Sequence, residues 1–179
     1  EASVPMLRRA IAQGVTYIDS AWSYINGTSE VAVGRAIKPF DRQALILATK
    51  IPSNDIRGPE WRQRLDLQLQ RFDTPYLDIM HFHGLRWDAF EEHISQEGGC
   101  LAAAHQAQSE GLIRHLAFSS HDRPENIQKL VETGEFEGVT LQFNILDRSL
   151  EQVLRLAHAR GMGTVIMGPV GGGRMALWS

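Results

Sequence analysis

Short apolar runs alternate with helix-type segments along the chain. Apolar runs of strand length predict six strands, at residues 15–19, 44–49, 76–82, 113–118, 139–143 and 164–167. The segments between them predict helices, at residues 7–13, 31–37, 59–71, 101–110, 124–132 and 150–160. Gly111 and Gly161 follow two of these helices, as glycine often does at a helix end. Nearly continuous apolar strands are typical of a parallel sheet that is buried on both faces.

Strict alternation of strands and helices predicts an α/β protein with right-handed crossovers. A doubly wound sheet and a barrel both fit this pattern. No Gly-x-Gly-x-x-Gly follows the first strand, and polar candidates follow many strands, so a (β/α)8 TIM barrel is favoured. A closed barrel has eight strands and typically ~250 residues. With only about six βα units, the chain is predicted to be a single partial barrel domain over residues 1–179. It would lack one strand before residue 1 and another after residue 179.

Composition narrows the classes of partner. The chain has 43% hydrophobic residues and a net charge of −3, and no basic face stands out, so a nucleic-acid partner is not expected. No apolar run has the length of a membrane span, and no signal peptide is visible, so no membrane partner is expected. The single cysteine, Cys100, fits a reducing compartment, and a cytoplasmic location is expected. The sequence does not predict an oligomeric state.

Four reactive side chains follow the first three predicted strands: Asp19, Tyr24, Lys50 and His83. Parallel neighbouring strands would bring them into one mouth. A free phenol has a pKa of about 10, and a neighbouring ammonium is expected to lower it. A carboxylate would hold the lysine, and an imidazole would bind the same substrate oxygen as the phenol. Together they predict a site that protonates a small-molecule carbonyl as hydride arrives.

Two other interpretations concern the same strand ends. Taken singly, each residue could be structural, with Asp19 and Lys50 an ordinary ion pair; Asp78, at the opposite rim, is expected to be structural. His81 and His83 are two residues apart, so they share one face of a strand. With His121 and Asp122 they could hold zinc, as in barrel hydrolases. That arrangement leaves Tyr24 and Lys50 unexplained, so no metal site is predicted.

The ends of the later strands carry groups that suit a dinucleotide. Hydroxyl and amide side chains there suit a carboxamide. The glycine-rich loop after the last strand would let backbone N–H groups approach a phosphate, beside an arginine. A plain flexible loop is the alternative. The candidate cofactor-binding residues are Ser119, Ser120, Gln142, Met167, Gly168, Pro169, Gly171, Gly172, Gly173 and Arg174.

Several stretches together resemble the aldo-keto reductase superfamily, in the family's order. They are residues 14–21 with Tyr24, Ser29 and Glu30, then residues 48–50, 76–83, 111–119, 141–144 and 169–173. The resemblance implies a (β/α)8 barrel, bound NADP(H), and reduction of carbonyls or oxidation of alcohols. It implies that Tyr24 is the general acid, completed by Asp19, Lys50 and His83. It also implies that Ser119, Ser120 and Gln142 contact the nicotinamide carboxamide.

The chain departs from the family's pattern at two positions. Ser120 stands where many members have asparagine, and Met167 where many stack an aromatic ring on the nicotinamide. The sequences of residues 118–121 and 167–173 resemble those of bacterial members of the family more than those of other members. The segment that usually grips the adenosine 2′-phosphate would lie beyond residue 179, so NADPH rather than NADH rests on the resemblance alone. A non-catalytic, nucleotide-binding regulatory member of the family is the alternative function.

Overall fold

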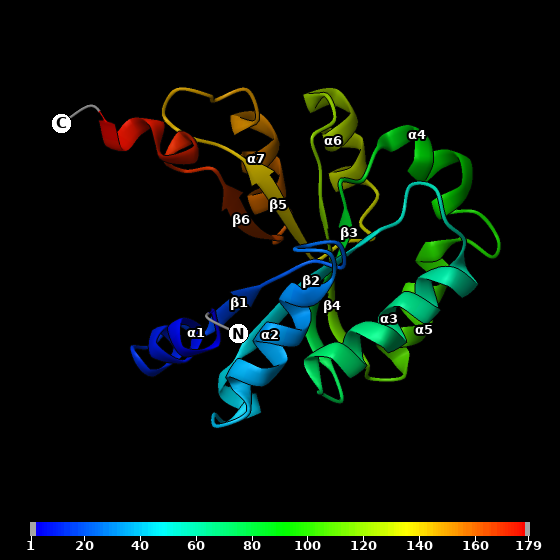
Figure 1. Cartoon of the computed structure of the whole chain (residues 1–179). Helices are drawn as coiled ribbons and strands as arrows, with labels where there is room; N and C mark the ends of the chain where they lie inside the picture. Colours follow the sequence, from blue (N-terminus) through cyan, green and yellow to red (C-terminus); the bar gives the residue numbers. More distant parts are fainter. Residues whose placement is uncertain (1–2, 178–179) are drawn as a thin grey trace.

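The computed structural model describes residues 3–177 and contains one six-stranded sheet. All neighbouring strands are parallel, in the sequential order β1 to β6 (Figure 1). The strands are β1 (Tyr17–Asp19), β2 (Ile46–Pro52), β3 (Leu77–His83), β4 (Ile113–Ser119), β5 (Gly138–Gln142) and β6 (Gly163–Met167). The α-helices are α1 (Ser3–Ala12), α2 (Thr28–Ile37), α3 (Gly58–Phe72), α4 (Trp87–Ala89), α5 (Cys100–Ser109), α6 (Pro124–Glu132) and α7 (Glu151–Ala159). Shorter helical turns are η1 (Arg42–Ala44), η2 (Phe90–Ile94) and η3 (Gly171–Leu177).

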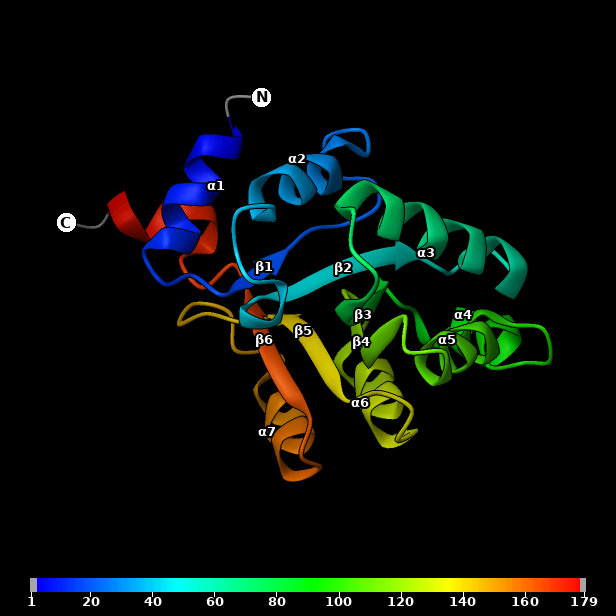
Figure 2. The same ribbon diagram turned by 90° about the horizontal axis from the view of Figure 1, so that it is seen from below.

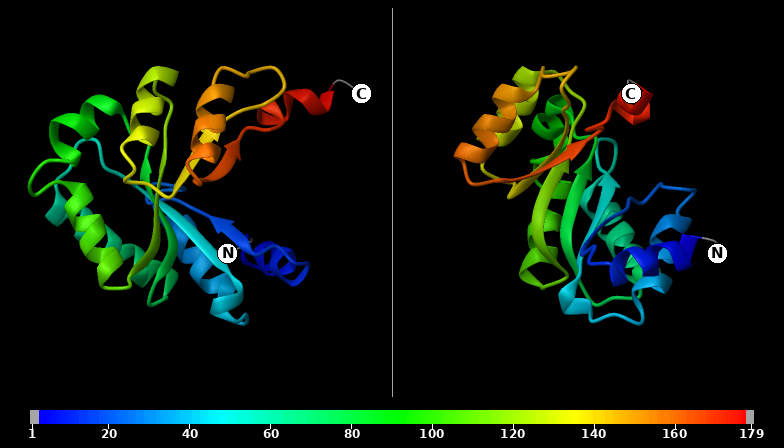
Figure 3. Two further views of the ribbon diagram at one scale, coloured as in Figure 1. Left: turned by 180° about the vertical axis from the view of Figure 1, so that it is seen from behind. Right: turned by 90° about the vertical axis from the view of Figure 1, so that its left-hand side faces the viewer.

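The sheet curls into part of a barrel, with β1 and β6 at its two edges (Figures 2 and 3). The crossover helices lie on its outer face, and neighbours such as α2 and α3 or α6 and α7 pack together. A doubly wound sheet would reverse its strand order and place helices on both faces. The predicted (β/α) barrel architecture with six βα units is therefore confirmed. Within residues 3–177, no helix combines the length and the apolar character needed to cross a membrane.

Phe82 of β3 shows which side chains face the barrel interior. Its ring points outward and stacks on Trp61 of α3, with the ring centroids 5.8 Å apart. Both side chains are fully buried in the layer between sheet and helices. Because side chains alternate along a strand, His81 and His83 on either side of Phe82 face the inside of the curl.

The predicted element boundaries were wrong at β2 and after β3. The second strand was expected over residues 44–49, but it runs from Ile46 to Pro52. Lys50 therefore lies within the strand, because its buried ammonium is paired and need not mark a strand end. The helical segment formed by α4 and η2 was not predicted at all.

Asp78 lies at the rim opposite the predicted site and ties three strands together. Its Oδ2 accepts a hydrogen bond from the Leu47 backbone N–H (2.9 Å) and pairs with Arg42 (2.7 Å). Its Oδ1 pairs with Arg114 (2.9 Å). Both guanidinium groups lie 4.1 Å from the centroid of the Tyr76 ring, one from β4 and one from η1. The structural role expected for Asp78 is confirmed.

Asp78→Ala should lower the free energy of unfolding by about 3 kcal/mol, because it leaves a buried N–H and two cations without their acceptor. Urea denaturation followed by circular dichroism measures this change. Asp66→Ala is the matched control: Asp66 forms a half-exposed i,i+4 pair with Arg62 on α3, and its loss should cost less than about 1 kcal/mol. Equal stability of the two variants would contradict the role assigned to Asp78.

Candidate active site

Lys50 is the buried centre of the predicted catalytic group. Its side chain is 3% exposed, and Nζ donates hydrogen bonds to Asp19 Oδ2 (2.5 Å) and to the Ser20 carbonyl (2.8 Å). Burial lowers the pKa of Lys50, while the carboxylates of Asp19 and Glu30 act in the opposite direction. Burial likewise raises the pKa of Asp19, and Lys50 opposes that rise. The expected pair between β1 and β2 is therefore present, and each partner keeps the other charged.

Tyr24 and His83 close over this pair at the carboxyl ends of the strands. Lys50 Nζ lies 5.4 Å from the centroid of the Tyr24 ring. The His83 ring meets the Tyr24 ring edge-on, with centroids 5.9 Å apart and planes at 80°. All four side chains named from the sequence are thus gathered at one place, although they lie 64 positions apart in the chain, from residue 19 to residue 83.

The protonation of Tyr24 differs from the sequence prediction. A lowered pKa was expected from the neighbouring ammonium, but the pKa of Tyr24 is raised, first by burial and then by the Asp19 carboxylate. Burial is the larger cause of the rise, and Asp19 adds to it by offsetting the charge of Lys50, so that the phenol faces an ion pair and not a lone cation. Tyr24 therefore holds its proton in the resting state, as a proton donor must.

His83 is placed to act as a neutral hydrogen-bonding group. Burial lowers its pKa, and Lys50 and then His121 lower it further. Its Nδ1 atom is buried and has no hydrogen-bond partner among the described residues. A neutral imidazole at this position has one nitrogen that can donate to a substrate oxygen.

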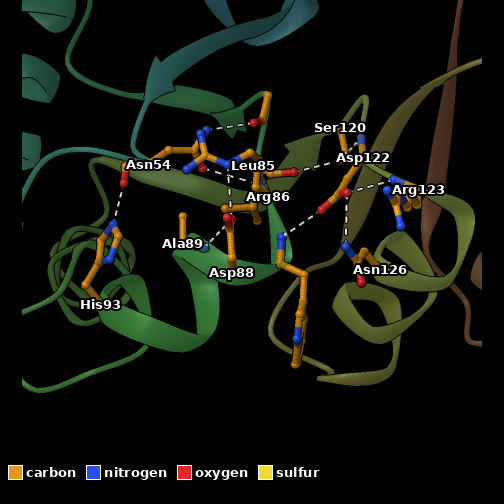
Figure 4. A network of polar contacts seen from close by, with 12 residues as sticks. Asn54, Leu85, Arg86, Asp88, Ala89, His93, Ser120, Asp122, Arg123 and Asn126 are labelled. Carbon is orange, nitrogen blue, oxygen red and sulfur yellow. Dashed lines mark hydrogen bonds and ion pairs between the residues drawn. The ribbon is translucent and has the colours of Figure 1, made fainter.

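The turn after His83 is held from two sides, by Asn54 after β2 and by Ser119 and Ser120 at the end of β4; Figure 4 shows Asn54 and Ser120 on either side of Leu85. Asn54 Nδ2 donates to the Gly84 carbonyl (2.8 Å), and the Gly84 N–H donates to Ser119 Oγ (3.0 Å). The Leu85 N–H donates to the Ser119 carbonyl (2.7 Å), while Ser120 Oγ donates to the Leu85 carbonyl (2.6 Å). These four bonds fix the backbone that carries the imidazole.

These contacts give Ser120 a different role from the predicted binding of a carboxamide. Its hydroxyl is fully buried, donates to Leu85 and accepts from the Asp122 N–H (3.1 Å). Ser120 therefore lies beneath the turn after His83. Its hydroxyl hydrogen is donated to Leu85, so it is not free to bind a carboxamide as the sequence predicted. Asn54 was missed from the sequence; its only signal was an amide side chain just after a strand end.

Two of the side chains named for a zinc site, those of His81 and Asp122, make hydrogen bonds to other groups. His81 Nδ1 lies 3.3 Å from the Thr49 carbonyl and Nε2 lies 3.0 Å from Thr140 Oγ1, and burial lowers the pKa of His81 to about 3. Asp122 accepts from the Trp87 and Arg123 N–H groups and from Asn126 (Figure 4). Over residues 3–177 no three His, Cys, Asp or Glu side chains are grouped so as to hold a metal. The geometry therefore gives the zinc interpretation, with His121 as a further ligand, no support.

A second group of predicted residues lines a cavity of about 770 Å³ beyond β5 and β6. From the predicted set, its lining includes Gln142, Gly168, Gly171, Gly172 and Arg174. The lining also includes Asn144, which sequence reasoning did not select, although it closes the same strand end as Gln142. Asn144 Nδ2 donates to the Gly168 carbonyl (3.2 Å) and so fixes the start of the loop.

The glycine loop has a backbone shape that depends on glycine. Gly171, Gly172 and Gly173 have φ of 59°, 68° and 89°, which L-residues with a Cβ rarely adopt. Arg174 Nε donates to the Gly171 carbonyl (3.1 Å), which keeps the guanidinium at the loop. Ser119, Met167, Pro169 and Gly173 lie outside the cavity lining. Ser119 instead accepts the hydrogen bond from Gly84 in the turn after His83. The N–H groups of Gly171 and Gly173 donate within the loop, to the Gly168 carbonyl (2.9 Å) and the Val170 carbonyl (3.1 Å). The Gln142 amide and the Arg174 guanidinium are the groups that suit a carboxamide and a phosphate, and so a dinucleotide.

Comparison with known proteins decides the family. The model of the aldo/keto reductase family matches residues 1–178. The chain belongs to this family. An uncharacterized oxidoreductase, YqkF of Bacillus subtilis (strain 168), is 30% identical over 96% of this aldo/keto reductase chain and 56% of its own length. The NADH-specific methylglyoxal reductase of Escherichia coli (strain K12) is 25% identical over 88% of the chain and 53% of its own length.

A solved structure shows the same fold. The holo form of the aldo-keto reductase AKR11C1 from Bacillus halodurans is 27% identical and superposes with a TM-score of 0.83. The match covers 96% of this aldo/keto reductase chain and 58% of that protein. The chain thus spans a little over half the length of the relatives it matches.

Proposed function

We propose that the protein is an oxidoreductase that uses NADP(H) to reduce an aldehyde or ketone to an alcohol by hydride transfer. One observation carries this proposal: the buried ammonium of Lys50, paired with Asp19, lies beneath the Tyr24 ring, and the His83 ring meets the Tyr24 ring edge-on. An ordinary structural ion pair would not need a phenol and an unpartnered imidazole placed above it. The family that the chain belongs to, whose relatives include oxidoreductases, supports the same conclusion.

In this proposal the substrate oxygen lies between the Tyr24 hydroxyl and the His83 ring. A nicotinamide held at the ends of β4 to β6 would supply hydride to the carbonyl carbon. As the oxygen gains negative charge, Tyr24 gives its proton to it and becomes phenolate, and an alcohol results. Lys50 stabilises the phenolate through its ammonium, and Asp19 holds Lys50 in place. The raised pKa of Tyr24 keeps the proton on the phenol until the oxygen is basic enough to take it.

The nucleotide residues lie on the later strands. Ser119 accepts from the Gly84 N–H and keeps its own hydroxyl hydrogen for a carboxamide oxygen. Gln142 is exposed at the end of β5 and can bind the carboxamide N–H group. The loop from Gly168 to Arg174 would bind phosphate oxygens through the Arg174 guanidinium, since the Gly171 and Gly173 N–H groups donate to carbonyls within the loop. We propose NADP(H) from the resemblance, and the NADH-specific relative makes NADH the form to compare.

Titration of the intact protein with NADPH and with NADH, followed by fluorescence, tests binding. Loss of absorbance at the nicotinamide band on adding a small aldehyde, such as methylglyoxal, tests turnover. Binding with turnover supports the proposal. Binding of either nucleotide without turnover on a panel of aldehydes and ketones would favour the non-catalytic regulatory alternative. Failure to bind either nucleotide would overturn both.

A further inference from the structure

A buried carboxylate lies behind the loop that carries Tyr24. Glu30, in the first turn of α2, has a fully buried side chain. Its Oε1 accepts from Thr49 Oγ1 (2.6 Å) and from Gln68 Nε2 (2.5 Å), and its Oε2 pairs with Arg71 Nη1 (2.9 Å). A buried charge is costly unless it is paired and hydrogen-bonded. Four elements are therefore held in one arrangement: α2, β2, α3 and, through Arg71, the loop between β1 and α2.

Arg71 reaches from α3 into that loop and contacts both of its limbs. Its Nη1 also donates to the Trp22 carbonyl (3.3 Å), and its guanidinium carbon lies 4.1 Å from the centroid of the Trp22 ring. On the other limb, a Cβ added to Gly27 would lie 3.2 Å from Arg71 Nη2. Tyr24 lies between these two contacts, two residues after Trp22 and three before Gly27.

The loop has a shape that Ile25, a β-branched residue, does not favour. Ile25, Asn26 and Gly27 have φ of 51°, 53° and 79°, so three successive residues are left-handed. Such a conformation persists only where the surroundings over-determine it. A hydrogen bond from Ser20 Oγ to Ser29 Oγ (2.8 Å) closes the base of the loop. Arg71, a side chain from α3, holds the part of the loop around Tyr24 through a hydrogen bond, stacking on a ring and a close contact.

Resting on the proposed function, we propose that Arg71, held by the buried carboxylate of Glu30, is a positioning residue for Tyr24. It fixes the loop of residues 20–29 in the shape that turns the phenol toward Lys50 and His83. Arg71 itself contacts none of the reacting groups. Its guanidinium acts by combining a bond to a carboxylate, a bond to a carbonyl and stacking on an indole, which an ammonium cannot do together.

The test is Arg71→Met in the intact protein. The kcat for aldehyde reduction should fall by about 10- to 100-fold, because a small misplacement of a catalytic group has effects of this size. The dissociation constant of NADPH should stay near that of the unchanged protein, since the nucleotide residues lie on β4 to β6. Arg71→Lys should restore only part of kcat. Arg64→Met is the matched control: Arg64 also lies over Trp22, at 5.5 Å, but it pairs with Glu60 and does not contact Glu30.

A double-mutant cycle separates positioning from general stability. In a Tyr24→Phe background, Arg71→Met should cause no further loss of the residual turnover, because the group it positions is already gone. Equal losses in both backgrounds, or a normal kcat for Arg71→Met alone, would overturn the inference. If Arg71→Met does not fold, as judged by its thermal midpoint, Glu30→Gln carries the same cycle. Should Tyr24→Phe itself retain normal turnover, the proposed function fails, and this result is distinct from failure of Arg71 alone.

Discussion

Tyr24→Phe is expected to lower carbonyl reduction by about 10²–10⁴-fold, the usual loss when a positioned general acid is removed. The variant keeps the ring, so its edge-on contact with His83 and its position near Lys50 are retained. What it loses is the proton that the growing negative charge on the substrate oxygen requires. Binding of NADPH should be nearly unchanged, because the candidate nucleotide residues begin at Ser119.

Fluorescence titration gives the NADPH affinity of the variant, and absorbance gives its rate with an aldehyde. Tyr76→Phe is the matched control: Tyr76 lies at the opposite rim, between Arg42 and Arg114, and its hydroxyl has no partner among residues 3–177. The control should reduce aldehydes at the normal rate. A Tyr24→Phe protein that also does so would remove Tyr24 as the acid and, with it, the proposed mechanism.

His81 is expected to make the fold sensitive to acid. Its pKa is about 3 in the folded protein, because burial disfavours the charged ring, and about 6.5 in an unfolded chain. Below about pH 6.5 the unfolded state binds one more proton at this site than the folded state does. The contribution of the neutral His81 ring to the free energy of unfolding is therefore fully present above about pH 6.5. It falls by up to about 1.4 kcal/mol per pH unit as the pH drops toward the folded pKa.

His81→Gln removes this titration, while an amide can still bond to the Thr140 hydroxyl. Urea unfolding of both proteins between neutral pH and about pH 4 should show a shallower loss of stability in the variant. His158→Gln on α7 is the control, because His158 is exposed in the folded protein as it is in the unfolded chain. Parallel curves for the unchanged protein and His81→Gln would show that the buried imidazole does not control acid stability.

The positions of the four side chains at strand ends were enough to predict that they meet, because the carboxyl ends of neighbouring parallel strands converge whatever the exact strand lengths. The alternation of apolar runs likewise predicted the parallel sheet and the sequential strand order. The direction of the Tyr24 pKa was wrong, since a sequence shows that an ammonium is near but not how far the phenol is buried, and burial is the larger cause of the rise. The end of β2 was wrong as well, because the buried Lys50 looks like the polar end of a strand that in fact continues to Pro52.

The supporting residues could not be read from local pattern. Glu30 and Arg71 are 41 positions apart, and each is an ordinary charged residue on an amphipathic helix. Asn54 and Ser120 meet at the turn after His83 only when β2 and β4 take their places beside β3. Contacts of this kind depend on the packing of elements, and no spacing along the chain reports them.

Because the strands follow one another in sequence order, the two groups of candidate site residues come from separate stretches of the sequence. The proposed acid–base group is encoded between Asp19 and His83, and the candidate nucleotide group between Ser119 and Arg174, with α4 to α5 separating the two. Substitutions after Ser120 could therefore alter the proposed cofactor preference during evolution while the residues of the earlier group stay unchanged. Chimeras of relatives would be best joined between β3 and β4. Such a recombinant must keep intact the hydrogen bonds that cross the joint, from the Gly84 and Leu85 N–H groups to Ser119 and from Ser120 Oγ to the Leu85 carbonyl.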